Sequence, residues 1–340
     1  MSKIKSLQVT DNMPRKVIVT GGGGFVGKAL CKRLIQLGFE VLSLSRGDYP
    51  ELRKIGIKTV QADVSSPLDK DLFDDVEAVF HTASKVDMWG RYQDFYQINV
   101  LGTQNIIDAC LAAGVDKLIY TSSPSVIADG KDHRGIDESY PYPKKHAAFY
   151  PETKAEAERR VLAANSEKFK TIALRPHLIF GPGDTGLGPT VIERAQAGKL
   201  IIIGPGKNLV DFTYIDDCVE AHLNAYQALS EKPEVVSGKA YFVSQGEPTK
   251  MWEWINKVLS LNGLSPVKKS VPYSIAMLLS SAIEFFSKVM PLKLKPTLTP
   301  FLVSQMSCDH YFSIERAKRD LGYKPTISID EGLEKTYKAA

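Results

Sequence analysis

A run of glycines between a short apolar segment and an amphipathic one constrains the fold of this chain more than any other feature. Residues 20–27 (TGGGGFVG) follow the β-branched run KVIVT and lead directly into KALCKRLIQLG. A glycine turn between strand and helix is typical of the first βαβ unit of a dinucleotide-binding sheet, where helix amides face a pyrophosphate. The spacing is GxxGxxG rather than GxGxxG, and a purely structural turn is the alternative. We expect dinucleotide binding by Gly21, Gly24, Phe25, Val26 and Gly27.

Short apolar runs alternate with longer helical patterns from residue 16 to residue 175, which predicts repeated βαβ units and a parallel sheet covered on both faces. In the helical segment 28–38, apolar residues share one face and Gly38 ends the pattern. The predicted fold class is therefore α/β, with a Rossmann-type doubly wound parallel sheet. The expected strands lie at 16–20, 40–45, 58–62, 77–82, 117–122 and 171–175.

The alternation loosens after the last of these strands. Proline and glycine cluster at 181–189 and 203–208, which indicates loops that leave the sheet. The stretch 211–229 predicts a return to the core and a helix capped by Asp216 or Asp217. The C-terminal remainder is mainly helical, and we expect it over the carboxyl ends of the strands, where open sheets bind ligands. The predicted division is a disordered tail at 1–13, a Rossmann dinucleotide-binding domain of 14–180 and 209–245, and a smaller substrate-binding lobe of 181–208 and 246–340.

Composition excludes several classes of function. The 340 residues include 43 lysines and arginines against 39 acidic residues, and a net charge of +4 gives no reason to expect nucleic acid as a partner. The first residues carry charges but no apolar stretch of a secretory signal. The cysteines are widely spaced, which indicates reduced thiols in a cytoplasmic protein and no metal site. They are Cys31, Cys110, Cys218 and Cys308.

The end of the second expected strand bears on the choice between NAD and NADP. An acidic side chain there would bind a ribose 2′-hydroxyl and repel a 2′-phosphate. This sequence has Ser45 and Arg46 instead, and a guanidinium pairs well with a phosphate. We therefore predict that NADP(H) is the cofactor and that Ser45 and Arg46 contact it, with NAD less favoured. The alternative is that Arg46 is only a surface residue and that Asp48 binds the ribose.

A tyrosine and a lysine one helical turn apart predict acid–base chemistry beside the cofactor. Tyr150 and Lys154 lie in YPETK, which opens a strongly helical segment, so both side chains share one helix face. An ammonium next to a phenol favours the phenolate and brings its titration from about pH 10 toward neutrality. Ser123, at the end of the fifth strand, would fix the substrate oxygen near this phenol. No GxSxG motif surrounds the serine, so a hydrolase triad has no support.

The chain resembles the extended short-chain dehydrogenase/reductases of the NAD-dependent epimerase/dehydratase superfamily over nearly its whole length. The motifs that carry this resemblance are TGGGGFVG, HTAS, INVLGTQNIIDAC, YTSS, YPETK and LRPHLIFGPGD. The resemblance implies that residues after the third strand contact the adenine and that residues after the fourth line the cofactor channel. It also implies a residue that supports the active-site helix and backbone contacts to the nicotinamide. Structural alternatives are a turn-forming role for Asp63 and a capping role for Asn99. The residues so assigned to the cofactor are Asp63, Val64, Ala83, Lys85, Asn99, Pro176 and Leu178, together with Tyr150 and Lys154.

Within this family, RPHLIFGPGD, NLVDFTYIDD and GKAYFVSQGEPTKMWEWIN are most similar to the 3β-hydroxysteroid dehydrogenase-like branch, in particular to the 2-alkyl-3-oxoalkanoate reductases of long-chain olefin biosynthesis. The resemblance implies NADPH-dependent reduction of a 2-alkyl-3-oxoalkanoate to the 3-hydroxy acid, a step of lipid metabolism. A related subgroup oxidises the 3β-hydroxyl of sterols or their 4-carboxylates, which is the first alternative. The expected substrate contacts are Met88, Trp89, Ser125 and His177, with Trp252 and Trp254 as further aromatic candidates.

Two other functions share the scaffold. Nucleotide-sugar 4-epimerases use the same tyrosine and lysine but hold NAD permanently, whereas a dehydratase needs an added acid–base pair where this chain has Pro124 and Ser125. A non-catalytic NADP-binding sensor would be expected to lack one of Ser123, Tyr150 and Lys154. All three are present, which favours an enzyme.

The most apolar part of the chain leaves two interpretations open. Residues 271–306 either pack as the core of the smaller lobe or contact the apolar substrate or a membrane surface. Glu284 and Lys288 interrupt the run before it could span a bilayer. We therefore expect a cytoplasmic protein, with membrane association at its surface as an open alternative. The family resemblance also implies a homodimer formed by helices at 91–113 and 150–165.

Overall fold

A seven-stranded sheet forms the centre of the molecule. The computed structural model describes residues 15–289, 296 and 298–338, so the expected tail at 1–13 lies outside the described residues. Every pairing in the large sheet is parallel, and the strand order is β12-β7-β5-β4-β1-β2-β3. The prediction of an α/β, Rossmann-type parallel sheet is confirmed. Its strands are β1 (Lys16–Thr20), β2 (Glu40–Ser45), β3 (Lys58–Gln61), β4 (Val76–His81), β5 (Lys117–Thr121), β7 (Lys170–Pro176) and β12 (Lys239–Val243).

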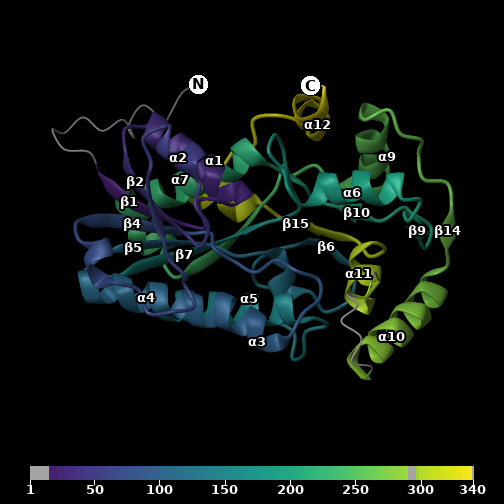
Figure 1. Ribbon diagram of the computed structural model, residues 1–340, viewed down its shortest axis with the longest axis horizontal. Coiled ribbons are helices and arrows are strands. Elements are labelled where there is room, and N and C mark those ends of the chain that lie inside the picture. The colour runs from purple at the N-terminus through teal and green to yellow at the C-terminus, as the bar shows by residue number, and fades with distance from the viewer. Residues whose placement is uncertain (1–14, 290–295, 297, 339–340) are drawn as a thin grey trace.

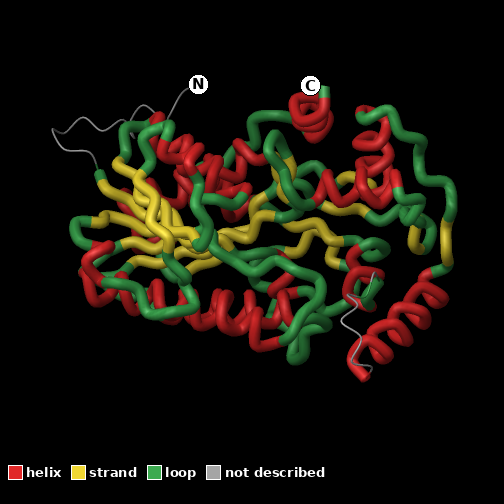
Figure 2. Tube along the Cα trace, in the orientation of Figure 1, coloured by secondary structure: helices red, strands yellow, loops and turns green. Residues whose placement is uncertain are grey.

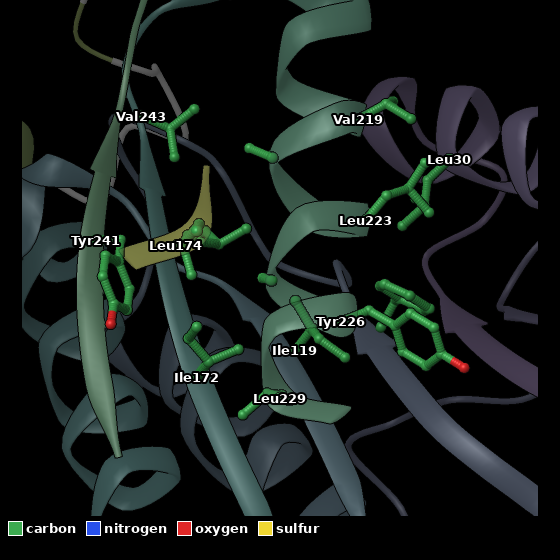
Figure 3. Close-up of a cluster of buried hydrophobic side chains, with 14 of the residues drawn as sticks. Leu30, Ile119, Ile172, Leu174, Val219, Leu223, Tyr226, Leu229, Tyr241 and Val243 are labelled. Carbon is green, nitrogen blue, oxygen red and sulfur yellow. The ribbon is translucent and has the colours of Figure 1, made fainter. Parts of the chain in front are cut away.

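Helices cover both faces of this sheet, with α1 and α7 on one side and α4 and α5 on the other (Figure 1). Alternate residues of one strand therefore enter different cores: Val17 and Val19 pack with α1 and α7, whereas Ile18 packs with α4 and α5. Figure 3 shows part of the first core, where Leu223 of α7 points toward Leu30 of α1 and Leu174 of the sheet lies on the other side of α7. Burial on both faces explains the continuous apolar runs of the strands. These helices are α1 (Phe25–Gln36), α4 (Gly102–Ala113), α5 (Phe149–Ala163) and α7 (Ile215–Glu231).

The register places the carboxyl ends of the central strands side by side. Thr20 at the end of β1 pairs with Leu44 of β2 and with His81 of β4. Thr121 at the end of β5 pairs with Leu174 of β7. The loops that follow these strands therefore open at one edge of the sheet, where open α/β sheets bind ligands.

The smaller lobe has its own aromatic core. The ring of Phe212 stacks on Trp254 with a centroid distance of 4.5 Å, and Phe180 packs edge-on against both. Trp252 and Trp254 are buried in this core, so the expectation that they line a pocket is wrong. Figure 2 shows helices predominating here, with α10 at the outer edge. The helices are α6 (Leu187–Gln196), α9 (Met251–Leu261), α10 (Tyr273–Val289), α11 (Pro300–Gln305) and α12 (Ile329–Tyr337).

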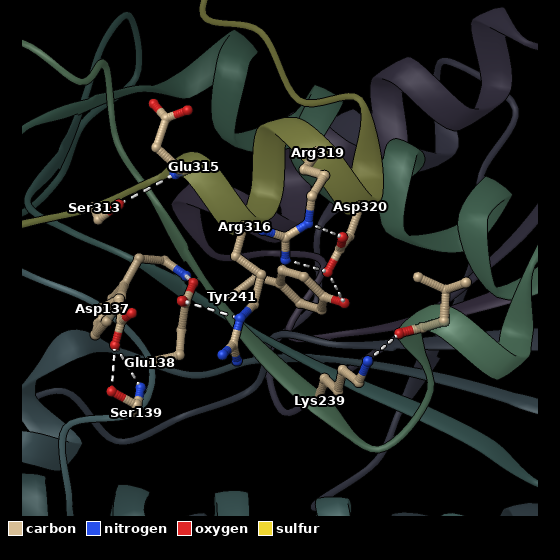
Figure 4. Close-up of polar contacts among 12 residues, drawn as sticks. Asp137, Glu138, Ser139, Lys239, Tyr241, Ser313, Glu315, Arg316, Arg319 and Asp320 are labelled. Carbon is tan, nitrogen blue, oxygen red and sulfur yellow. Dashed lines mark hydrogen bonds and ion pairs between the residues drawn. The ribbon is translucent and has the colours of Figure 1, made fainter.

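The segment 310–323 returns from the lobe to the large body. Strand β15 pairs with β6, and Phe312, Ile314 and Tyr323 join the core beside α7. Figure 4 shows the polar contacts that fasten this segment, including Arg316 with Glu138 at 3.3 Å. The predicted domain boundaries assign residues 310–323 to the smaller lobe, whereas these contacts join them to the large body. The boundaries themselves stay a prediction. The short strands are β6 (His133–Ile136), β8 (Ile179–Phe180), β9 (Ile202–Ile203), β10 (Leu209–Val210), β11 (Thr213–Tyr214), β13 (Thr249–Lys250), β14 (Ser270–Val271) and β15 (His310–Phe312).

The first turn of α7 differs from expectation. The helix begins at Ile215, and its cap residue is Tyr214, without a side-chain capping bond. Asp216 and Asp217 lie inside the first turn, so the expectation that one of them caps the helix is wrong. Asp217 is instead buried, and it accepts hydrogen bonds from the backbone and hydroxyl of Thr326. The remaining short helices are α2 (Pro50–Arg53), α3 (Tyr92–Phe95) and α8 (Pro233–Val236).

Candidate active site

The glycine turn after β1 has a geometry that only glycine satisfies at two positions. Gly21 has a φ of +69°, a conformation that L side chains rarely adopt. A Cβ added at Gly27 would lie 2.3 Å from the Gly21 carbonyl oxygen, so α1 could not approach β1 as closely with any other residue. Gly24 donates to Gly21 O at 2.8 Å, and the helix begins at Phe25, followed by Val26. The first amides of α1 are thus presented at the sheet edge, as a pyrophosphate requires.

The end of β2 contacts this turn. Ser45 Oγ accepts a hydrogen bond from Gly23 N at 3.1 Å, which ties the two loops together. Arg46 follows on the surface and, among the described residues, forms no ion pair. Asp48 is held by two contacts with the guanidinium of Arg53. The carboxylate that could bind a ribose is therefore already paired, whereas the guanidinium at the strand end is available.

Residues after β3 and β4 complete the rim. Asp63 accepts from the backbone and hydroxyl of Ser65 at 2.9 and 2.8 Å, which is the turn-forming arrangement, and Val64 beside it is buried. Ala83 lies against Gly21, since a Cβ added at Gly21 would be 2.9 Å from the backbone of Ala83. Lys85 Nζ contacts Asp87 at 2.7 Å. These residues lie in the loops after β3 and β4, and their contact with a dinucleotide stays a prediction.

Asn99 links the rim to α5. It lies in a π-helical turn (Tyr96–Leu101), a local widening that is common at functional sites. Its amide oxygen accepts from Lys85 N at 2.7 Å and from Ser84 Oγ at 3.1 Å. Its amide nitrogen donates to Thr153 Oγ1 at 3.0 Å. Asn99 thus connects the loop after β4 with the helix that carries Tyr150 and Lys154, rather than capping a helix.

Ser123, Tyr150 and Lys154 meet at the carboxyl end of β5. Lys154 is 2% exposed, and its Nζ donates to Thr121 O at 2.6 Å. Burial lowers the pKa of Lys154 from 10.5 to about 7, although a nearby carboxylate acts in the opposite direction. Burial also raises the pKa of Tyr150, and the hydroxyls of Ser123 and Ser125 partly offset that effect. The expected lowering of this pKa by the ammonium of Lys154 is therefore wrong for this structure, because burial outweighs it. A phenol, an amine and a serine hydroxyl are thus positioned for proton transfer to a substrate oxygen.

Tyr150 opens onto a cavity of about 860 Å³ between the body and the lobe. Its walls include Met88 and Trp89, two of the residues predicted to contact substrate. The opposite side is formed by Phe285 of α10 and Phe301 of α11. The cavity is large enough for a long apolar molecule whose reacting carbon reaches Tyr150.

Ser125 and His177 lie on the other side of the serine loop, in a narrow space shared with His310. His310 Nε2 donates to Gln305 O at 2.7 Å, so its Nδ1 accepts from His177 Nε2 at 2.6 Å. Burial lowers the pKa of both imidazoles, to about 4 for His310. His177 follows Pro176 at the end of β7 and precedes Leu178, whose φ of 36° turns the chain away from the sheet. His177 therefore does not share the large cavity with Met88 and Trp89.

One buried charge cluster behind the site was missed from the sequence. Glu158 is fully buried one helical turn beyond Lys154, and Arg175 of β7 contacts it with Nη2 and Oε1 2.6 Å apart. The spacing of Tyr150, Lys154 and Glu158 at four-residue intervals was a readable signal for this alignment. The described part of the chain contains no group of three or more His, Cys, Asp or Glu side chains able to hold a metal ion.

Comparisons with known proteins agree with this geometry. Residues 18–272 match the model of the 3-beta hydroxysteroid dehydrogenase/isomerase family. The chain is 43% identical over 324 residues to a 2-alkyl-3-oxoalkanoate reductase of Stenotrophomonas maltophilia, covering 94% of this chain and 98% of that protein. It is 37% identical over 338 residues to the decarboxylating human sterol-4-alpha-carboxylate 3-dehydrogenase, covering 97% and 89%. The solved UDP-glucuronic acid 4-epimerase of Bacillus cereus, in complex with NAD, shares the fold with a TM-score of 0.73 at 22% identity, covering 95% and 97%.

Proposed function

This chain belongs to the 3-beta hydroxysteroid dehydrogenase/isomerase family of the extended short-chain dehydrogenase/reductases, and we propose that it reduces a long-chain 2-alkyl-3-oxoalkanoate to the 3-hydroxy acid with NADPH. As a member of this family it is an NAD(P)-dependent oxidoreductase. The observation that carries the proposal is the placement of Tyr150 at the wall of a large cavity, with Lys154 buried one helical turn away on α5. The similarity to the Stenotrophomonas reductase over 94% of the chain supports the substrate class.

The reaction divides its tasks among three side chains. The glycine turn would hold a nicotinamide dinucleotide, which would supply the hydride. Tyr150 donates the proton that the substrate oxygen takes up, and Ser123 orients that oxygen. Lys154 lies behind the phenol and would bond the nicotinamide ribose, while Asn99 holds the start of α5 in place through Thr153. Val64, Ala83, Lys85, Pro176 and Leu178 would line the groove on either side of the glycine turn.

We expect NADP to be preferred over NAD because of the end of β2. Asp48 is paired with Arg53, and Arg46 is exposed beside the glycine turn. An Arg46→Ala variant should lose about tenfold or more in affinity for NADPH, the worth of one charge-assisted phosphate contact, and little for NADH. Fluorescence titration with both cofactors measures this, with Lys54→Ala as an exposed control. Equal losses for NADPH and NADH would contradict the preference.

The proposed substrate is apolar, and α10 exposes an unusual number of apolar side chains beside the cavity mouth. Leu278 is 72% exposed, and Ser281, Glu284 and Phe285 of the same helix line the cavity. Within the described residues, no helix has both the length and the apolarity to cross a bilayer. We propose that α10 rests on a lipid surface, with the exposed Lys268 and Lys269 facing anionic headgroups.

A cytoplasmic homodimer through α4 and α5 remains our expectation, to be tested by sedimentation.

The decisive experiment offers three substrates in parallel to the purified protein with NADPH. These are a 2-alkyl-3-oxo acid, a 3-ketosteroid and a UDP-sugar, and the bound dinucleotide is identified by denaturing the protein. Rapid NADPH oxidation with the 2-alkyl-3-oxo acid alone is the expected result. Preferential turnover of the steroid would replace the substrate assignment by a sterol dehydrogenase. Tightly bound NAD with conversion of the UDP-sugar would replace it by an epimerase.

A further inference from the structure

The ammonium of Lys154 lies in surroundings that favour its neutral form. Its Nζ donates to the uncharged carbonyl oxygen of Thr121, and the centroid of the Tyr120 ring lies 4.2 Å from Nζ. His81 on β4 also faces it, as a buried imidazole with a strongly lowered pKa. Among the described residues, no carboxylate makes an ion pair with Lys154. A buried amine without a charged partner tends to lose its proton, so something must keep this one charged.

The carboxylate of Glu158 is placed to do so. Residues four apart on a helix are neighbours, so Glu158 lies one turn from Lys154 on the same face of α5. It is fully buried, so water does not screen its charge. It raises the pKa of Lys154 against the effect of burial.

Glu158 is itself fixed from two other elements. Arg175 Nε contacts its two carboxylate oxygens at 3.2 and 3.0 Å, and Nη2 contacts Oε1 at 2.6 Å. The hydroxyl of Tyr142 donates to the same oxygen at 2.5 Å. Tyr120 of β5 and Ser122 just after it also face the carboxylate, and Glu138 faces Arg175.

We propose that Glu158, locked by Arg175 and Tyr142, is a positioning residue that holds Lys154 as an ammonium behind Tyr150. This inference rests on the proposed function only in that it takes Lys154 to contact the cofactor and to assist Tyr150. It gives the Glu158–Arg175 ion pair a role in keeping Lys154 protonated, which a purely structural ion pair would not have. Removal of the negative charge should release the proton of Lys154 at lower pH.

The test is the pH dependence of NADPH affinity, measured by cofactor fluorescence without any substrate. In the wild-type protein, affinity should weaken as pH rises through about 7, where Lys154 loses its proton. In Glu158→Gln the same weakening should begin about one pH unit lower or more, a tenfold change in proton affinity. Glu156→Gln, at a half-buried glutamate of the same helix, is the matched control and should leave the profile in place. Lys154→Met should abolish this step in the profile.

A second variant covers the case in which Glu158→Gln does not fold. The double variant Glu158→Gln/Arg175→Met removes the ion pair as a unit, so neither of its two charges is left buried without the other. A downward shift of the profile in either variant supports the proposal. A profile within about 0.3 pH units of the wild type in a folded variant, even one of lowered stability, overturns it. If the wild-type protein binds no NADPH, the proposed function fails first, so the two failures are distinguishable.

Discussion

Helices α5 and α10 border the same cavity but place their side chains in opposite environments. In α5, Lys154 and Glu158 are charged and buried at 2% and 0% exposure. In α10, Leu278 and Phe285 are apolar and exposed at 72% and 61%. Each arrangement costs stability by the usual rule that apolar groups are inside and charges outside, and each is therefore informative about function. The difference matches the two proposed roles, which are proton transfer at α5 and contact with an apolar partner at α10.

The largest effect is expected from the phenol at the start of α5. Tyr150→Phe removes the proton donor while it preserves the ring, so turnover should fall about 10²- to 10⁴-fold with little change in NADPH affinity. Steady-state NADPH oxidation and a fluorescence titration measure the two quantities. Tyr92→Phe, at a partly exposed ring that packs on Phe149, is the control and should retain activity. Undiminished turnover in Tyr150→Phe would remove the acid–base assignment and with it the contrast between the helices.

Breaking the buried ion pair of α5 should cause the largest loss of stability. Arg175→Met leaves the Glu158 carboxylate buried and uncompensated, which should cost about 3–5 kcal/mol in the free energy of unfolding. Urea unfolding measures the cost. Arg91→Met removes a pair with Asp94 whose arginine side chain is 84% exposed, and it should change stability by about 0.5 kcal/mol or less. Similar losses in the two variants would mean that burial of the α5 charges has no special consequence.

The sequence predicted the α5 site better than its surroundings, for a physical reason. Tyr150 and Lys154 are four residues apart, and the glycine turn directly follows a strand that the apolar pattern reveals. The α/β sheet predicted from the same pattern was confirmed. Arg175 and His310 come from segments remote from the residues they contact, and no local pattern indicates such pairs. The aromatic run around Trp252 looked like a pocket wall because apolar periodicity does not distinguish a core from a cavity lining. The roles of the predicted site residues remain predictions.

A third variant measures how strongly the fold shifts the titration of Lys154. Its folded-state pKa of about 7 lies below the usual 10.5, so between these values the unfolded chain binds more protons. Wild-type stability should therefore rise with pH above 7, relative to Lys154→Met, by at most about 1.4 kcal/mol per pH unit. Below pH 7 the difference should be constant. Urea unfolding across this range measures it, with Lys32→Met at an exposed position of α1 as control. A flat difference above pH 7 would show that Lys154 is not perturbed by burial.

The smallest change in stability is expected from α10, and that smallness is itself the test. Leu278→Ser/Leu279→Ser replaces two side chains that are 72% and 52% exposed, so the free energy of unfolding should change by only about 0.5 kcal/mol. The same variant should lose most of its binding to anionic vesicles, because it removes apolar area that would enter the headgroup region. Co-sedimentation measures this binding, and Ile55→Ser, at an exposed isoleucine after α2, is the control. A large loss of stability would mean that α10 packs against another part of the protein instead. Unchanged vesicle binding would mean that the exposed leucines of α10 do not contact the lipid, and the proposed membrane contact would be wrong.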